Sequence, residues 1–342
     1  MSPVIDIREV TKIFGRNPER ALAMLGEGRG KQEIQAETGN VIGLDRVSLS
    51  VEPGEIFVVM GLSGSGKSTL IRHVNRLIDP TAGEIVVNGV DIMAMDAEGL
   101  RTYRRNTVSM VFQRFGLLPH RSVLGNVAFG LEVRGMGREE RNAAARRWIE
   151  SVGLGGYETS RPRQLSGGEQ QRVGLARALA MDTPILLMDE AFSALDPLNR
   201  TQMQGELLAL QTKLRKTILF ITHDFDEALK LGTRIAILRD GAVVQVGRPE
   251  EIVLSPANDH VEAFVRNVSR ARAIPLLAVM EKGQFQPHPA ALPVTARCEE
   301  ALPLFAANDW IGVTDEAGTQ VGRVGLKAVL LALAQPATPG PQ

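Results

Sequence analysis

The chain has 342 residues, of which 44% are hydrophobic and 23% charged, which is ordinary for a globular protein and excludes a disordered chain. Its 39 basic residues balance 39 acidic ones, so no net positive charge indicates nucleic acid or an anionic lipid surface as a partner. The single cysteine, Cys298, excludes an internal disulfide and multi-cysteine metal sites, as expected in the cytoplasm. No apolar stretch approaches the roughly eighteen residues of a membrane helix, so we expect any membrane association to come through another protein.

The N-terminal part predicts two half-buried strands with a helical insertion between them. Polar and apolar residues alternate over residues 4–10 and again over residues 47–51. Between these stretches, Asn17 and Pro18 are suited to begin a helix, and glycines over 26–30 separate it from a second short helix at 31–37. We therefore expect a helical hairpin, over about residues 16–40, on the surface of a sheet.

A glycine-rich stretch follows an apolar run, residues 56–60, that predicts a buried strand. The stretch matches G-x-x-x-x-G-K-[ST], a pattern in which backbone N–H groups surround a phosphate at the N-terminus of a helix. Lys67 supplies a mobile positive charge for the outer phosphates, and the Ser68 hydroxyl is placed to ligate Mg²⁺. The pattern predicts a site for a nucleoside triphosphate, whose binding residues are Gly61, Leu62, Ser63, Gly64, Ser65, Gly66, Lys67, Ser68 and Thr69.

The rest of the N-terminal two-thirds continues an α/β pattern. Residues 84–92 predict two strands around an Asn88–Gly89 turn, so part of the domain is expected to be antiparallel. Residues 114–164 are mostly helical in pattern, with 138–152 as the clearest amphipathic run. Strands buried in the sheet, the last two covered on both faces, are expected at residues 108–112, 184–188 and 217–221.

Two carboxylates, Asp189 and Glu190, follow the strand predicted at 184–188. At the carboxyl edge of a parallel sheet, such groups lie beside the phosphates of a bound nucleotide. We expect Asp189 to hold the Mg²⁺ shell and Glu190 to polarise the attacking water.

The most specific pattern is Leu165-Ser-Gly-Gly-Glu-Gln-Gln-Arg-Val173. Ser166, followed by Gly167 and Gly168 at the start of a helix, makes a second anion-binding helix N-terminus. Because residues 61–69 already surround the phosphates of their own subunit, the natural ligand of this second site is the nucleotide of a partner subunit. Ser166 can also act as an ordinary helix cap, which leaves the glycine pair unexplained. The pattern therefore predicts a dimer with ATP bound in trans.

These motifs together resemble the ATP-binding cassette (ABC) family, and the resemblance implies roles for further residues. Gln113 looks like the glutamine that senses Mg²⁺ and contacts the membrane partner. Asp196 lies in a loop, residues 193–196, that resembles the one crossing the dimer interface. His223 looks like the histidine that holds the γ-phosphate and the attacking water. Phe14 matches the aromatic that stacks on adenine, although an aromatic after a strand is more often part of a core.

The implied fold is α/β: an ABC-type nucleotide-binding domain over residues 1–270, with a P-loop core sheet, an antiparallel subdomain and a helical subdomain at about 114–164. Residues 271–335 predict a small α+β domain with a helical stretch at 296–307, strands at 310–314 and 320–324, and a closing helix at 326–334. This order resembles one cystathionine-β-synthase (CBS) repeat. Relatives with such a tail carry two repeats, so we expect this one to pair with its copy in the second cassette, or else to be a loosely ordered appendage. Residues 336–342 are expected to be a disordered tail.

The sequence also discriminates among the functions of cassette ATPases. Chromosome and DNA-repair members carry long coiled coils or cysteine-rich zinc modules, translation factors carry two cassettes in one chain, and exporters are commonly fused to membrane helices. This chain has a short segment between Gln113 and Ser166, one cysteine and one cassette. The resemblance therefore indicates an importer ATPase encoded separately from its permease.

One branch resembles the chain over residues 4–268, namely the importers of glycine betaine, proline betaine and choline. A histidine-type amino-acid importer is the alternative, and a cassette ATPase acting on nucleic acid is a weaker one. The resemblance implies ATP with Mg²⁺, a homodimer of cassettes, two integral membrane permease subunits and, indirectly, a substrate-binding protein, with no nucleic acid. The chain would be peripheral on the cytoplasmic face of the inner (plasma) membrane, and residues 115–120 would contact the permease.

Overall fold

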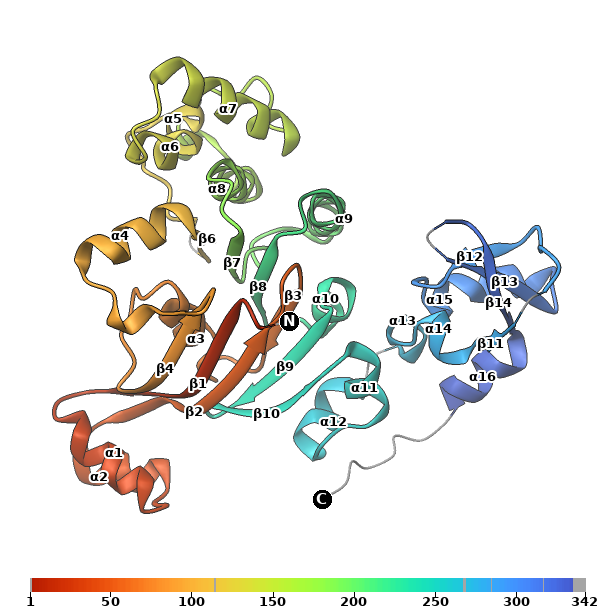
Figure 1. Ribbon diagram of the computed structural model, residues 1–342, viewed down its shortest axis with the longest axis horizontal. Helices are drawn as coiled ribbons and strands as arrows, with labels where there is room; N and C mark the ends of the chain where they lie inside the picture. Colours follow the sequence, from red (N-terminus) through yellow and green to blue (C-terminus); the bar gives the residue numbers. More distant parts are fainter. Residues whose placement is uncertain (1, 114, 267–268, 284, 316, 335–342) are drawn as a thin grey trace. The chain divides into compact units, whose positions relative to one another are not determined.

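The computed structural model of the chain describes residues 2–113, 115–266, 269–283, 285–315 and 317–334 (Figure 1). The chain divides into two compact units, one made of Met1–His223 with Ala236–Val243 and the other of Asp224–Ile235 with Val244–Gln342. The tail expected to be disordered, residues 336–342, lies outside the described residues. Among the residues described, no helix combines the length and the apolar character needed to cross a membrane.

The first unit contains an antiparallel sheet with strand order β2-β1-β4-β5. Strands β1 (Ile5–Phe14) and β2 (Val41–Val51) confirm the two predicted strands and are both longer than predicted, since their pairing continues as far as Phe14 opposite Val41. Strands β4 (Ala82–Val87) and β5 (Val90–Asp91) confirm the predicted antiparallel hairpin. A 3₁₀ helix, η1 (Ile92–Ala94), follows β5.

The insertion between β1 and β2 is the predicted helical hairpin, α1 (Pro18–Gly26) and α2 (Lys31–Thr38) (Figure 1). Its helices close over a small apolar cluster of their own, formed by Ile13, Ala21, Met24, Leu25 and Ile34. An ion pair from Arg20 of α1 to Glu37 of α2 joins the two helices, and Arg29, in the loop between them, pairs with Glu33 and Glu37 of α2. The hairpin thus packs on itself and on the adjoining ends of β1 and β2.

A second sheet has strand order β10-β9-β3-β8-β7-β6. Its predicted members are β3 (Ile56–Met60), β6 (Val108–Val111), β7 (Ile185–Asp189) and β8 (Thr217–Thr222), and their pairing is parallel as expected. Every residue of β3, β7 and β8 is buried, so polar side chains become accessible only where these strands end. Strands β9 (Arg234–Arg239) and β10 (Ala242–Gly247) were not predicted from the sequence.

Helices of the first unit place the motifs at the carboxyl ends of these strands. Helix α3 (Lys67–Val74) follows β3, and α9 (Pro197–Leu214) follows β7. The helical subdomain expected at 114–164 is confirmed as a set of short helices that pack against α8 (Figure 1). The helices within this range are α5 (Val123–Val127), α6 (Phe129–Val133), α7 (Arg138–Ser151) and η2 (Pro162–Gln164). Helix α4 (Ala97–Asn106) precedes the range and α8 (Gly167–Ala180) follows it.

The second unit contains a four-stranded sheet of order β11-β14-β13-β12. Strands β13 (Trp310–Thr314) and β14 (Gln320–Gly325) and helix α16 (Leu326–Ala334) confirm the sequence predictions. The helix expected over 296–307 is interrupted, because Pro303 converts its second half to a 3₁₀ turn. The remaining elements are α10 (Phe225–Leu231), α11 (Pro249–Leu254), α12 (Asp259–Val265), α13 (Arg270–Ala273), α14 (Leu276–Val279), β11 (Glu281–Lys282), β12 (Ala291–Pro293), α15 (Cys298–Ala301) and η3 (Leu302–Ala306).

The apolar core around this small sheet includes Ala271, Ile274, Cys298, Ile311 and Val324. The domain boundary predicted between residues 270 and 271 falls inside α13 and stays a prediction, as does the likeness to a CBS repeat.

Candidate functional site

The glycine loop joins the buried strand β3 to helix α3, as the sequence predicts. Within it, the Nζ of Lys67 donates hydrogen bonds of 2.8 Å to the carbonyl oxygens of Gly61 and Leu62. Burial lowers the pKa of Lys67, while the nearby charges of Glu190 and Asp189 oppose that shift. The loop therefore holds a cation over its own carbonyl groups, where an anionic phosphate would compete for it.

Gly66, at the start of α3, must be glycine for two reasons. Its φ of 98° lies in the left-handed region, and a Cβ on it would lie 2.6 Å from the carbonyl oxygen of Gly43. Gly64 also has a positive φ, of 81°, but the space around it is open. The loop is thus packed tightly against β2 at Gly66 and is accessible at Gly64.

Ser68 and Asp189 are brought together from the loop and from the end of β7. The Ser68 hydroxyl donates a hydrogen bond of 2.7 Å to Oδ1 of Asp189, and a guanidinium nitrogen of Arg72 lies 3.4 Å from Oδ2. Burial raises the pKa of Asp189, and the Ser68 bond partly offsets this. A hydroxyl and a carboxylate oxygen side by side are hard donors of the kind that Mg²⁺ selects, so the predicted pair fits that ion. The sequence interpretation missed Arg72, although it follows Ser68 by one helical turn.

Glu190 is held in place by its own backbone at the end of β7. Its φ is 47°, its N–H donates to the carbonyl oxygen of Ile221 at 3.0 Å, and its carbonyl oxygen accepts from the Ser193 hydroxyl at 2.9 Å. A non-glycine residue in this left-handed conformation is strained, and such strain concentrates at functional sites. These bonds thus hold the backbone of Glu190 in place at the end of β7.

The Glu190 carboxylate meets the two other residues predicted for this edge of the sheet. Its Oε2 accepts a hydrogen bond of 2.8 Å from Nε2 of Gln113 and lies 3.5 Å from Nδ1 of His223. The side chain of His223 is 58% exposed, whereas that of Glu190 is only 15% exposed. The structure therefore brings the predicted catalytic pair together. It places the Gln113 amide on Glu190 and not on the Ser68–Asp189 pair.

The residues predicted to act in trans lie at two other helix N-termini. Ser166 caps α8 in a reciprocal arrangement with Glu169, whose carboxylate accepts from the Ser166 N–H at 2.7 Å and from its hydroxyl at 2.9 Å. These bonds lower the pKa of Glu169. The ordinary cap that the sequence allowed for Ser166 is therefore present, while Gly167 beside it is exposed.

Asp196 is exposed and caps α9. It accepts hydrogen bonds from the side-chain amide of Asn199 at 2.6 Å and from the Asn199 backbone at 3.1 Å. These bonds lower the pKa of Asp196. The carboxylate thus stays ionised at an exposed helix N-terminus.

Phe14 ends β1 and is 40% exposed, so it is available for stacking.

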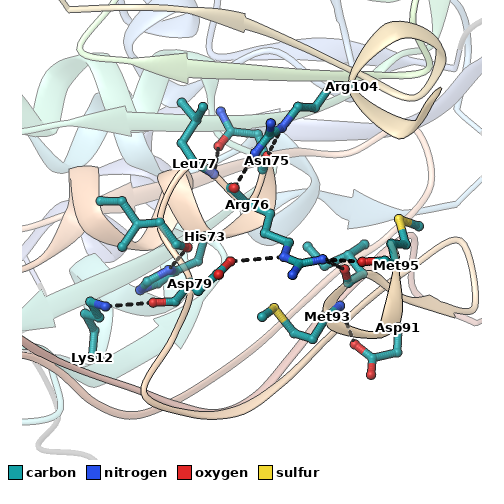
Figure 2. A network of polar contacts seen from close by, with 12 residues as sticks. Lys12, His73, Asn75, Arg76, Leu77, Asp79, Asp91, Met93, Met95 and Arg104 are labelled. Atoms are coloured by element: carbon teal, nitrogen blue, oxygen red, sulfur yellow. Dashed lines mark hydrogen bonds and ion pairs between the residues drawn. The ribbon is translucent and has the colours of Figure 1, made fainter. Parts of the chain in front are cut away.

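A polar network fixes the chain that follows α3, and Lys12 of β1 contacts this part of the chain at Asp79 (Figure 2). In this network, Arg76 donates to the carbonyl oxygens of Ile92 and Met95 at 3.0 and 2.8 Å, and Arg104 donates to that of Asn75 at 3.0 Å. The network ties the C-terminal end of the helix that follows the glycine loop to η1 and to α4.

Comparison with known proteins identifies the chain's family. The family model for ABC transporters matches residues 44–193. The glycine betaine/carnitine transport ATP-binding protein GbuA of Listeria monocytogenes is 55% identical over 276 residues, which are 81% of this chain and 70% of the relative. The glycine betaine/proline betaine transport system ATP-binding protein ProV of Escherichia coli is 53% identical over 268 residues, 78% of this chain and 67% of the relative. The trimethylamine N-oxide transport system ATP-binding protein TmoW of Ruegeria pomeroyi is 53% identical over 273 residues, 80% of each chain.

A solved structure extends the likeness to the fold. The dimeric structure of a post-hydrolysis state of the ATP-binding cassette MJ0796, bound to ADP and Pi, superposes with a TM-score of 0.61 at 32% identity, covering 71% of this chain and 97% of that one. The glycine loop, the carboxylates at the end of β7 and the capped glycines of α8 lie within residues 44–193, which the family model matches. The chain belongs to the ABC transporter family and is one of its ATP-hydrolysing proteins.

Proposed function

We propose that the chain is the ATPase subunit of an importer for a quaternary amine osmolyte such as glycine betaine, proline betaine or choline. The supporting observation is the identity of 55% and 53% to two glycine betaine transport ATPases over about four-fifths of the chain. The names of other relatives add carnitine and trimethylamine N-oxide. All these solutes carry a nitrogen with methyl groups, so the class of solute is better defined than any single member of it.

At the nucleotide site, residues 61–69 bind the phosphates of ATP, with Lys67 on the outer ones. Ser68 and Asp189 hold Mg²⁺, which when bound neutralises charge on the phosphate oxygens. Glu190 accepts a hydrogen bond from the attacking water and orients it, and His223, which lies beside Glu190, contacts the γ-phosphate. Gln113 donates a hydrogen bond to Oε2 of Glu190 and so holds that oxygen of the carboxylate in place.

Two copies of the chain form the complete site. The N-terminus of α8, with Ser166 and Gly167 exposed and Gly168 half-buried, and the exposed carboxylate of Asp196 meet the nucleotide of the partner subunit. The dimeric state of the solved relative supports this arrangement. The relative was solved with ADP and Pi, so the dimer belongs to the hydrolytic cycle of that protein.

The permease subunits contact the groove beside the segment 115–120. A cavity of about 230 Å³ opens here, lined by residues of α4, β6, α6 and α8 together with Phe112, which follows β6, and Met181, which follows α8. Arg177, on α8, donates hydrogen bonds of 2.6 and 2.8 Å to the carbonyl oxygens of Gly116 and Phe115. A displacement of this segment would therefore reach α8, whose first turn carries the glycines that meet ATP in trans. Through this contact the chain is peripheral to the inner membrane.

In the C-terminal unit we propose a regulatory or dimer-bracing role. Helix α16 leaves Leu326, Leu330 and Leu331 exposed, by 37%, 51% and 56% of their surface. Pairing with the same unit of a second cassette would bury these side chains.

The importer assignment is tested by isolating the chain from membranes with its co-purifying proteins and assaying solutes on the binding protein. We expect tight binding of glycine betaine, proline betaine or choline, and ATPase stimulation by the loaded binding protein. Binding of histidine with no binding of methylated amines would overturn the proposal.

A further inference from the structure

Gly43, in β2, lies against the ring of Phe14. A Cβ on Gly43 would be 2.7 Å from Cε2 and 3.2 Å from Cδ2 of that ring, and the next atom, the carbonyl oxygen of Lys12, would be 3.6 Å away. The backbone of Gly43 lies outside the left-handed region, so an alanine could adopt its conformation without strain. The Phe14 ring is therefore the one close obstacle to a side chain at position 43 among the residues that the structure describes.

Lys12 bounds the same ring on one of its faces. Its Nζ lies 5.3 Å from the ring centroid and donates a hydrogen bond of 2.8 Å to the carbonyl oxygen of Asp79. The Asp79 carboxylate in turn accepts from Nε of Arg76 at 3.0 Å, within the network of Figure 2. The ammonium group is thus fixed by a structured loop. The Phe14 ring is thus bounded by Gly43 at one edge and by Lys12 over one face, and the residue is still 40% exposed.

Gly43 also contacts the glycine loop directly. Its carbonyl oxygen lies 2.6 Å from the positions where a Cβ would stand on Gly66 and on Gly241. The N–H of Gly241 donates to the carbonyl oxygen of Ser65 at 3.1 Å, and its carbonyl oxygen accepts from the N–H of Asp45 at 2.8 Å. One residue of β2 therefore contacts the Phe14 ring on one side and the first residue before α3 on the other.

We propose that Gly43 and Lys12 are positioning residues that hold the Phe14 ring at a fixed distance from the phosphate loop, where it stacks on the adenine of ATP. The inference rests on the proposed role of Phe14. A methyl group at position 43 displaces the ring and weakens the contact with the base. The triphosphate contacts of residues 61–69 and the Glu190 carboxylate keep their places.

The test uses the full chain and five variants: Gly43→Ala, Lys12→Met, Phe14→Ala, the double variant Gly43→Ala/Phe14→Ala, and Gly26→Ala. Gly26 is the matched control, because it is an exposed glycine of the neighbouring insertion with nothing within 4 Å of a Cβ. For each variant the KM for ATP, the kcat and the inhibition constant of inorganic triphosphate are measured. Inorganic triphosphate lacks the base, so its inhibition constant separates base stacking from phosphate binding.

We expect Gly43→Ala and Phe14→Ala each to raise the KM for ATP by about two- to tenfold, the range of one aromatic stacking contact, with kcat nearly unchanged. Lys12→Met should shift KM in the same direction by a smaller factor. In the Phe14→Ala background, Gly43→Ala should add nothing, because the obstacle to its methyl group has gone. The inhibition constant of inorganic triphosphate and all constants of Gly26→Ala should match the unmodified chain.

Additive effects of Gly43→Ala and Phe14→Ala would overturn the positioning role and leave the stacking role of Phe14 standing. An unchanged KM in both Gly43→Ala and Lys12→Met, with a raised KM in Phe14→Ala, would do the same. An unchanged KM in Phe14→Ala would remove the stacking role and the inference together. If Gly43→Ala alone does not fold, a sixth variant, Lys12→Met/Phe14→Ala, decides the question. The inference stands if Lys12→Met adds nothing to the KM in the Phe14→Ala background, and it falls if the two effects add.

Discussion

The side-chain amide of Gln113 donates a hydrogen bond of 2.8 Å to the carboxylate of Glu190, across 77 positions of the sequence. Gln113 lies two positions before the segment 115–120 that we assign to the permease, and Glu190 is the proposed catalytic carboxylate. A shift of the segment that moved Gln113 would therefore change the hydrogen bonding of Glu190.

Glu190→Gln should reduce kcat by about 10²- to 10⁴-fold, the usual contribution of a positioned base, while the affinity for ATP stays the same. The amide retains an oxygen that can accept from Gln113 but loses the negative charge that orients water. Rapid-quench hydrolysis and equilibrium ATP binding measure the two quantities. Lys67→Ala is the contrasting variant and should lose binding. A near-normal rate in Glu190→Gln would remove the catalytic assignment.

Mixing Lys67→Ala subunits with Ser166→Arg subunits should restore one competent composite site per heterodimer. Each homodimer lacks one half of both sites, whereas in the heterodimer both changes fall in the same site and leave the other intact. ATP turnover is measured against the mixing ratio. Full turnover by either homodimer alone would contradict the head-to-tail arrangement.

His73 should make the protein less stable as the pH falls. Its Nδ1 lies 2.6 Å from the carbonyl oxygen of Ile78, and burial lowers its pKa below the ordinary 6.5, an effect that this hydrogen bond only partly offsets. The unfolded chain then binds more protons than the folded one below that value, so the free energy of unfolding declines as the pH falls from about 7 to about 5. Thermal unfolding of His73→Asn, which keeps a donor and does not titrate, should show a shallower decline.

The exposed His120 supplies the control for that experiment. His120→Asn is measured alongside as the matched replacement of a histidine at an exposed position. Equal slopes of Tm against pH in the unmodified chain, His73→Asn and His120→Asn would show that the pKa of His73 does not change when the protein unfolds.

Cys298 should react slowly with maleimide in the native protein. Its side chain is fully buried, and burial raises its pKa to about 11, whereas the thiolate is the reactive form. Because the chain has one cysteine, the labelling rate reports on the C-terminal unit alone. Mass spectrometry over time, with and without denaturant, gives the rate. Labelling as fast as in denaturant would favour the loosely ordered appendage.

Truncation after Ser269 removes α13 to α16 and should weaken the ATP-bound dimer by roughly tenfold, if the exposed leucines of α16 pair. The KM for ATP should change little. Truncation after Ala334 is the control, because it removes only the terminal tail. Unchanged dimer stability, salt response and transport after the longer truncation would exclude a bracing or regulatory role.

Local patterns predicted much of the site. The glycine loop, the Asp189–Glu190 pair at a strand end and the Ser166 cap depend on neighbours in sequence, and the structure places each on the expected element. The distances that bring Gln113 and His223 to Glu190 depend on the order of strands in the sheet, which periodicity does not encode. Arg72 was missed although it follows Ser68 by one helical turn and shares Asp189 with it as a partner.

Strand boundaries were predicted less well where the alternation of side chains fails. Strand β1 continues to Phe14, but register shifts between Ile7 and Ile13 and the burial of Thr11 break the simple pattern. Strand β12 pairs in parallel with β13 over three residues that include Pro293, a residue typical of edges and turns. In both cases tertiary pairing outweighs the local preference.

The pairing of Phe14 with Val41 has a consequence for how the chain folds. Residues 15–40 form a loop that leaves the paired strands after Phe14 and returns to them at Val41. Closing a long flexible loop costs chain entropy before any contact between the strands is gained. The α1–α2 hairpin shortens that loop if it forms first, because its apolar cluster joins residues close in sequence, among them Ile13 at the very end of the ladder. We therefore expect the hairpin to fold early and the outer end of the β1–β2 ladder to form upon it.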